Sequence, residues 1–164
     1  FKYEQALRPL YTWYNGEADH YILGDTIDPE QVTVVAGPRG DVSDVKARIW
    51  PFKLHSGNQI YDTKHKWLIV PKTFGKGGYW SEFDWDLACE LGSKDTGLPY
   101  SGAYDFAPTV MYWPLSHMVA EKEKALSCKD CHQNQAFDWE ALGYPGDPSL
   151  LGDRRQMNLL KEGN

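Results

Sequence analysis

The stretch Cys128-Lys129-Asp130-Cys131-His132 has the pattern Cys-x-x-Cys-His, which is the attachment motif of c-type haem. Two cysteines three positions apart on one turn of helix can each add to a vinyl group of the same haem. The histidine that follows then lies under the porphyrin and can bind the iron. We therefore expect Cys128 and Cys131 to attach one haem c, with His132 as the proximal iron ligand.

Two other uses of paired cysteines remain open. Zinc needs four ligands and usually takes them from two Cys or His pairs of similar spacing, but Cys89 is the only further cysteine in the chain. A redox-active dithiol of the thioredoxin kind is expected near a βαβ pattern, and no such pattern leads into Cys128. Haem attachment is therefore the leading interpretation.

Length and composition limit the class of protein. The 164 residues, 41% of them hydrophobic, are enough to bury the core of one domain. The net charge of −6 disfavours nucleic acid and anionic membranes as partners, and no apolar run is long enough for a transmembrane segment. We expect a single haem-binding domain over residues 1–164, in which residues 146–164 form an extended tail or strap. Because c-type haem is attached outside the cytoplasm, we expect a periplasmic or extracellular location.

The chain contains 15 glycines and 10 prolines, and this content favours short elements and many loops. Alternating or compact apolar runs predict short strands. The expected strands cover residues 31–35, 45–50, 67–70 and 109–113. Pro51 is expected to close the second of them, which would leave His55 in a loop.

One helix is expected from Ser81, a good N-cap, to a stop at Gly92. Its expected core face consists of Phe83, Leu87 and Leu91. Cys89 is expected to be a buried thiol packed near Trp85. Together these patterns predict an α+β fold, low in regular structure, with short strands in the first half and helices around the haem motif in the second.

The second axial position of the iron has several candidate ligands, of which His117 is the strongest. It lies just after Pro114, at the start of a helix expected over 117–126, with Ser116 as its cap. Nine helical residues rise about 14 Å, so His117 is expected to reach a neighbouring haem rather than its own. The weaker candidates are His55, His20 and His65, and then Met111, Met118 and Met157. For each histidine, an ordinary surface or core role is the alternative.

Aromatic side chains near the motif in sequence are candidates to wall the haem. They are Trp113, Tyr112, Phe137 and Trp139. An ordinary role in the core is equally open to all four.

Several longer runs resemble one family. They are PFKLHSGNQIYD, VPKTFGKGGYWSEFDWDLA, YSGAYDFAPTVMYWPLSHMVAEKEKALSCKDCH and LGYPGDP. They resemble the C-terminal part of octahaem c-type cytochromes of the tetrathionate reductase type, which are similar in haem arrangement to multihaem nitrite and hydroxylamine enzymes. The resemblance covers roughly residues 11–148 and implies a fold like that of a multihaem cytochrome.

The resemblance carries over to few residues. Cys128, Cys131 and His132 match the last haem motif of that family, and His117, in PLSHMV, matches a position where the family places a distal histidine. An octahaem protein needs eight attachment motifs, however, and this chain has one. The catalytic haem of the family, with its lysine ligand, belongs to an N-terminal part that is absent here. The resemblance therefore implies a partner, either a haem-rich cytochrome chain or the missing N-terminal part.

Three functions follow as expectations. The first is electron transfer through one haem c, as a subunit or C-terminal segment of a multihaem reductase. The second is a docking module that completes haem sites on a haem-rich partner. The third is an oxidoreductase with an open haem site for a small nitrogen or sulfur oxyanion. No catalytic residue is assigned, because any catalytic haem is expected on another chain or segment.

Overall fold

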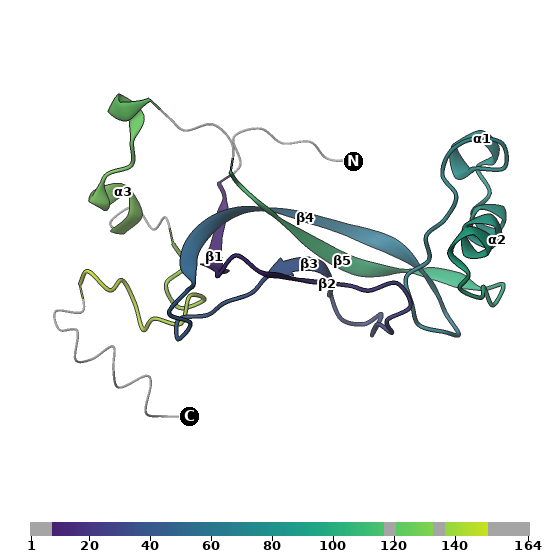
Figure 1. Cartoon of the computed structure of the whole chain (residues 1–164), viewed down its shortest axis with the longest axis horizontal. Helices are drawn as coiled ribbons and strands as arrows, with labels where there is room; N and C mark the ends of the chain where they lie inside the picture. Colours follow the sequence, from purple (N-terminus) through teal and green to yellow (C-terminus); the bar gives the residue numbers. More distant parts are fainter. Residues whose placement is uncertain (1–7, 117–120, 133–136, 151–164) are drawn as a thin grey trace. The chain divides into compact units, whose positions relative to one another are not determined.

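The computed structural model describes residues 8–116, 121–132 and 137–150. Within these residues, five strands form one sheet in the order β1-β4-β5-β3-β2, accompanied by three short helices and one 3-10 turn (Figure 1). The strands are β1 (Leu10–Tyr14), β2 (Ala18–His20), β3 (Thr33–Pro38), β4 (Arg48–Asp62) and β5 (Tyr104–Pro114). The sheet is mixed, because β1 pairs with β4 antiparallel and β3 pairs with β5 parallel. The prediction of a loop-rich α+β fold is confirmed.

The contacts divide the chain into two compact units. Unit 1 contains residues 1–18, 38–54 and 112–164, and unit 2 contains residues 19–37 and 55–111. The long strands β4 and β5 each contribute residues to both units. The expectation of a single haem-binding domain over residues 1–164 stays a prediction.

Strand β4 is longer than the sequence indicated. It continues through Pro51, so the predicted strand end at this proline is wrong, and His55 lies in the strand rather than in a loop. Pro51 is tolerated because it sits opposite Tyr11 in the β1 ladder and its carbonyl still accepts a hydrogen bond from the Leu115 N–H (2.9 Å). The only group that proline removes is its own N–H.

In unit 2, the end of β4 is buried on both faces. Successive side chains of a strand point to opposite sides, and here Ile60 and Tyr61 belong to separate clusters. Ile60 packs with Ile69 and Cys89, whereas Tyr61 packs with Leu68 and Ala107. The predicted strand at 67–70 is reduced to an isolated bridge between Tyr61 and Leu68, although Leu68 and Ile69 are buried as expected.

Two helices lie next to one another in this unit, α1 (Tyr79–Glu82) and α2 (Trp85–Thr96) (Figure 1). The N-cap of α2 is Asp84, whose carboxylate accepts a hydrogen bond from the Leu87 N–H (3.1 Å), so the predicted cap at Ser81 is wrong. Gly97 ends α2 in the left-handed conformation (φ 77°), which glycine adopts without strain. Cys89 is fully buried in the cluster against which Trp85 packs, as expected.

Gly92 does not end the helix. It is buried inside α2, where an added Cβ would meet the carbonyl oxygen of Val70 and approach Pro71 Cα to 2.9 Å. The predicted core face is also wrong in part, since the Phe83 side chain is 70% exposed. Small residues face the core here because the backbone at 70–71 passes so close to α2.

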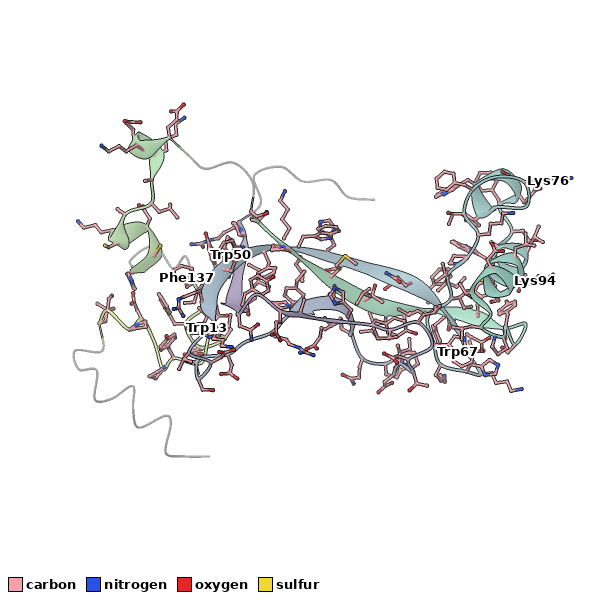
Figure 2. The ribbon with its side chains drawn as sticks, viewed as in Figure 1. Trp13, Trp50, Trp67, Lys76, Lys94 and Phe137 are labelled. Atoms are coloured by element: carbon pink, nitrogen blue, oxygen red, sulfur yellow. The ribbon has the colours of Figure 1, made fainter. Side chains whose placement is uncertain are left out.

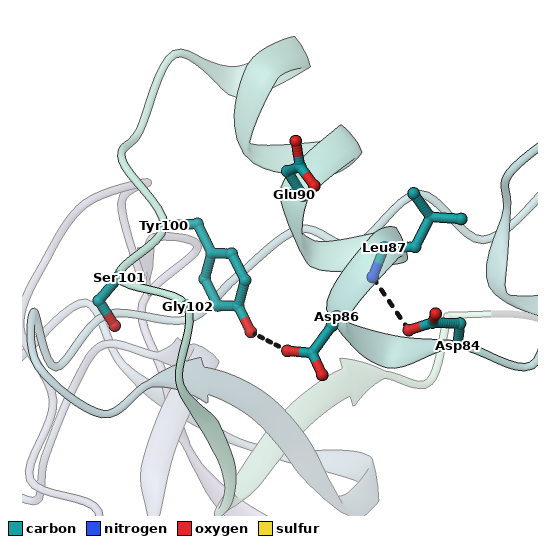
Figure 3. A pocket seen from close by; sticks show the side chains of 7 residues that line it. All are labelled: Asp84, Asp86, Leu87, Glu90, Tyr100, Ser101 and Gly102. Carbon is teal, nitrogen blue, oxygen red and sulfur yellow. Dashed lines mark hydrogen bonds between the residues drawn. The ribbon is translucent and has the colours of Figure 1, made fainter.

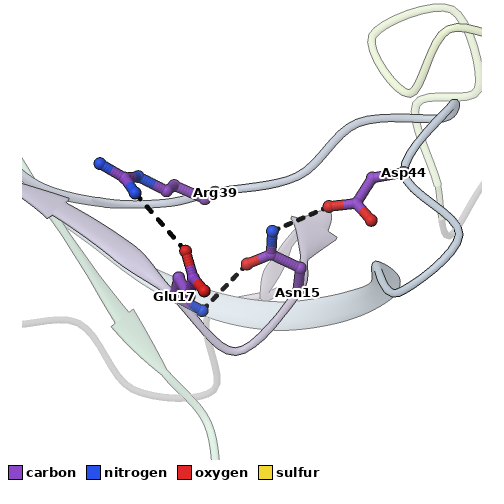
Figure 4. Close-up of polar contacts among 4 residues, drawn as sticks. All are labelled: Asn15, Glu17, Arg39 and Asp44. Carbon is purple, nitrogen blue, oxygen red and sulfur yellow. Dashed lines mark hydrogen bonds and ion pairs between the residues drawn. The ribbon is translucent and has the colours of Figure 1, made fainter.

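In unit 1, a polar network fixes the turn after β1. The Asn15 side-chain amide donates to Asp44 (2.8 Å) and accepts from the Glu17 N–H, and Arg39 pairs with Glu17 at 3.5 Å (Figure 4). The hydrogen bond from Asn15 is the main cause that lowers the pKa of Asp44. Beside this network, Phe52 is buried and makes edge-to-face contacts with Tyr14 and Tyr112. Within the described residues, no helix is long and apolar enough to cross a bilayer.

Candidate haem-attachment site

The motif forms its own short helix, α3 (Cys128–His132). Ser127 and Asp130 initiate it, because the Asp130 carboxylate accepts hydrogen bonds from both the N–H and the hydroxyl of Ser127 (2.7 Å each). The carboxylate thus reaches back to the N–H at the helix start, as the acidic residue of a capping box does, and the bonds from Ser127 lower the pKa of Asp130. The two cysteines therefore lie one turn apart, with Cys128 exposed and Cys131 half-buried, and both thiols are free.

The helix expected over 117–126 is wrong at the end that the structure describes. Only Lys122–Lys124 form a 3-10 turn, η1, and Ala125 is extended (ψ 137°). A continuous rise of about 14 Å from Met118 to Leu126 therefore no longer applies. His117 itself lies outside the described residues, so its role as distal ligand stays a prediction.

His132 contacts two residues of the following segment. Its ring stacks on Trp139, with centroids 5.3 Å apart and planes 9° apart. Its Nδ1 lies 2.8 Å from Oδ1 of Asp147. The His132 side chain is 34% exposed, whereas that of Asp147 is only 8% exposed. One edge of the imidazole is thus held by a buried carboxylate, while part of the ring remains accessible.

The chemistry of Asp147 decides which nitrogen of His132 is available. Burial acts to raise the pKa of Asp147, but hydrogen bonds from the N–H and hydroxyl of Ser149 (2.9 and 2.8 Å) and from His132 outweigh it, so the pKa lies below its ordinary value. Asp147 is then ionised at neutral pH and can only accept, so His132 Nδ1 carries the proton. The lone pair of Nε2 is left for a metal. Two thiols one turn apart, one exposed and one half-buried, and a histidine whose Nε2 has no hydrogen bond to a described residue fit a covalently attached haem.

Aromatic residues anchor this segment to β1 within unit 1. Trp13 and Phe137, both labelled in Figure 2, are members of unit 1. The Trp13 indole N–H donates to the carbonyl of Leu142 (2.9 Å), and Phe137 packs edge-to-face on Tyr11 with centroids 4.5 Å apart. Phe137 also contacts Trp139. Of the four expected haem-walling residues, Trp139 therefore stacks on His132, and Phe137 contacts Trp139.

The other predicted site residues lie elsewhere on the strands and loops. Trp113 is near the end of β5 and is 52% exposed. His20 ends β2, and both it and His55 are exposed. His65 stacks on Trp67, with centroids 4.4 Å apart. Their expected roles as ligands or haem contacts stay predictions, as does that of the half-buried Met111 in β5.

Unit 2 also contains an open acidic pocket of about 590 Å³ (Figure 3). Asp84, Asp86 and Glu90 of the α2 region line it, and the Tyr100 hydroxyl donates to Asp86 (2.7 Å). Burial, reinforced by this bond to Asp86, raises the pKa of Tyr100. Across the described ranges no cluster of three or more His, Cys, Asp or Glu residues is arranged to hold a metal ion.

Sequence reasoning did not find Asp147. It lies 15 positions after His132, in a Gly-Asp-Pro-Ser stretch that reads only as a turn. The sequence offers only a weak signal for Asp147, which is that an aspartate in a turn can accept hydrogen bonds from the residue two positions later.

Comparisons with known proteins identify a family and a similar solved structure. Residues 1–135 match the family described as bacterial cytochrome c. A solved structure, the octaheme cytochrome c from Shewanella oneidensis, is 53% identical over 89% of this chain, with a TM-score of 0.85. The chain spans 35% of the length of that structure. No curated protein matches significantly. With its family match extending over most of its length, this chain belongs to the bacterial cytochrome c family.

Proposed function

We propose that this chain transfers electrons through one covalently bound haem c, as a segment or subunit of a multihaem cytochrome. Family membership supports covalent haem c and haem-based electron transfer in general. The observation that carries the finer proposal is the arrangement around His132, whose Nδ1 is engaged by Asp147 and whose Nε2 is left for iron. Cys128 and Cys131 would hold the haem through thioether bonds.

The bound haem would supply a one-electron couple between ferric and ferrous iron. The residues of this chain would orient the proximal ligand. Asp147 holds the proximal imidazole, and Trp139 packs against the face of its ring. The exposed Cys128 keeps the attachment site open to solvent. We propose His117 as a distal ligand, either of this haem or of a neighbouring one, on the resemblance of PLSHMV to that position in octahaem cytochromes.

The proposed partner is a haem-rich polypeptide. The similar solved protein is named an octaheme cytochrome, and this chain spans about a third of it while containing one attachment motif. A protein with eight haems needs polypeptide beyond what this chain supplies. We extend the proposal to a tetrathionate-reductase-like assembly in the periplasm or outside the cell, where c-type haem is attached.

Intact-mass spectrometry of the chain, produced with a c-type haem maturation system, tests the cofactor. We expect the mass of the polypeptide plus one haem. Replacing both Cys128 and Cys131 by Ser should abolish the added mass, whereas the matched control Cys89→Ser should retain it. A bare polypeptide mass for the unmodified chain would refute the proposal and return the zinc and dithiol interpretations.

A second candidate function, docking onto haem sites of a partner, is favoured by exposed aromatic side chains in unit 2. Phe74, Trp80 and Phe83 are 76%, 52% and 70% exposed. Phe83 is the left-handed C-cap of α1 (φ 55°). Replacing Trp80 and Phe83 by Ser should weaken co-purification with a haem-rich chain while leaving haem attachment intact. Unchanged co-purification would count against docking.

An open catalytic haem is the third candidate. It predicts a high-spin spectrum that changes on addition of cyanide or nitrite. The electron-transfer proposal predicts a low-spin spectrum that is insensitive to both. The two readings can therefore be separated on the same haem-loaded sample.

A further inference from the structure

Asp147 has a feature that its turn does not explain. Its side chain is 8% exposed, and its Oδ1 accepts three hydrogen bonds, from His132 and twice from Ser149. The other oxygen, Oδ2, is buried and has no hydrogen-bond partner among the described residues. A buried carboxylate with one unsatisfied oxygen is costly to maintain, so its position beside His132 calls for a compensating role.

That role follows from the place of the carboxylate. A carboxylate that accepts from the second nitrogen of a metal-binding histidine fixes the orientation of the ring and makes it a stronger electron donor. A buried negative charge is also poorly screened, and ferric haem carries one more positive charge than ferrous haem. Both effects favour the oxidised iron.

We propose that Asp147 is a positioning residue that orients His132 and lowers the reduction potential of the haem attached at Cys128 and Cys131. The inference rests on the proposed function, because it needs His132 to be the proximal ligand. It assigns the tuning of the haem to a residue outside the attachment motif. Trp139 contacts the face of the same imidazole, since its ring lies parallel to that of His132.

The test is an optical redox titration of the haem-loaded chain. Asp147→Asn keeps the shape of the side chain and an acceptor for Ser149 but removes the charge. It should favour the ferrous form about tenfold, the lower range of effects of outer-shell partners, which is a rise of about 59 mV for a one-electron couple. Asp147→Glu retains the charge and should move the potential back toward that of the unmodified chain.

Asp138→Asn is the matched control. Asp138 is an exposed aspartate that caps the neighbouring turn by accepting from the Ala141 N–H (3.0 Å). Its loss should change the ferric-to-ferrous ratio less than about twofold, because exposed charges are screened by solvent. An equal shift in Asp138→Asn and Asp147→Asn, or no shift in either, would overturn the proposal.

One further measurement does not depend on the variants folding. In the ferrous low-spin form, the Nδ1 proton of His132 should give a slowly exchanging NMR signal, since Asp147 shields it from water. Rapid exchange of this proton would contradict the proposal. Absence of haem from the unmodified chain would refute the proposed function itself, whereas a haem-loaded chain whose potential ignores Asp147 would refute only this inference.

Discussion

At the scale of single residues, Asp62 shows how a buried charge is stabilised in this fold. It is fully buried at the end of β4. Its carboxylate accepts from the N–H groups of Lys64 (2.9 Å), His65 (2.8 Å) and Ser101 (2.6 Å). Burial acts to raise the pKa of Asp62, but these bonds together hold it below its ordinary value. The fold therefore stabilises the ionised form of the Asp62 carboxylate.

Replacing Asp62 by Ala should lower the free energy of unfolding by about 1–3 kcal/mol, because the N–H groups of Lys64, His65 and Ser101 lose their acceptor. The sign of the pH effect follows from the lowered pKa. The contribution of Asp62 is present above the unfolded pKa of about 3.9 and is lost as pH falls through the folded pKa. Urea denaturation from pH 7 down to pH 3 checks both statements.

The exposed Asp95 is the control at this scale. Asp95→Asn should change stability by no more than about 0.5 kcal/mol and leave the pH dependence as it is. Asp62→Asn should flatten the acid limb of the stability curve. A steep acid limb that survives in Asp62→Asn would show that another carboxylate dominates it.

At the scale of elements, α2 is closed at both ends by residues that satisfy its terminal backbone groups. Asp84 caps the first turn and Gly97 closes the last, with its N–H donating to the Ser93 carbonyl (2.9 Å). Asp84→Ala should cost about 1 kcal/mol, seen as a lower urea midpoint together with reduced helical circular dichroism. Asp84→Ser keeps a capping oxygen and should recover most of that loss. Equal losses in both variants would mean that the carboxylate acts through the acidic pocket rather than as a cap.

At the scale of the whole molecule, stability depends on contacts between segments far apart in sequence. In unit 1 the turn at 138–143 is tied to β1 by the Trp13 N–H···O=C bond to Leu142, across 129 positions. Trp13→Phe should remove this bond and cost about 1 kcal/mol, with faster hydrogen exchange at residues 139–144. Trp67→Phe, in unit 2, is the comparison and should leave exchange in that segment unchanged. Unaltered exchange in Trp13→Phe would show that ring packing alone holds the turn.

The sequence by itself determined what is local in this protein. Haem attachment needs residues within one helical turn, so the motif at 128–132 could be recognised from the sequence. The burial of Cys89 and the loop-rich α+β class could be predicted from it as well. Only the tertiary structure decided the passage of β4 through Pro51, the continuation of α2 past Gly92, and the pairing of His132 with Asp147 and Trp139. Each of these depends on a residue outside the local pattern that the sequence displays. Pro51 stays within the strand while it faces Tyr11 of β1, Gly92 leaves the room that the Val70 carbonyl needs beside the helix, and Asp147 reaches His132 because the fold brings the segment after α3 back to it.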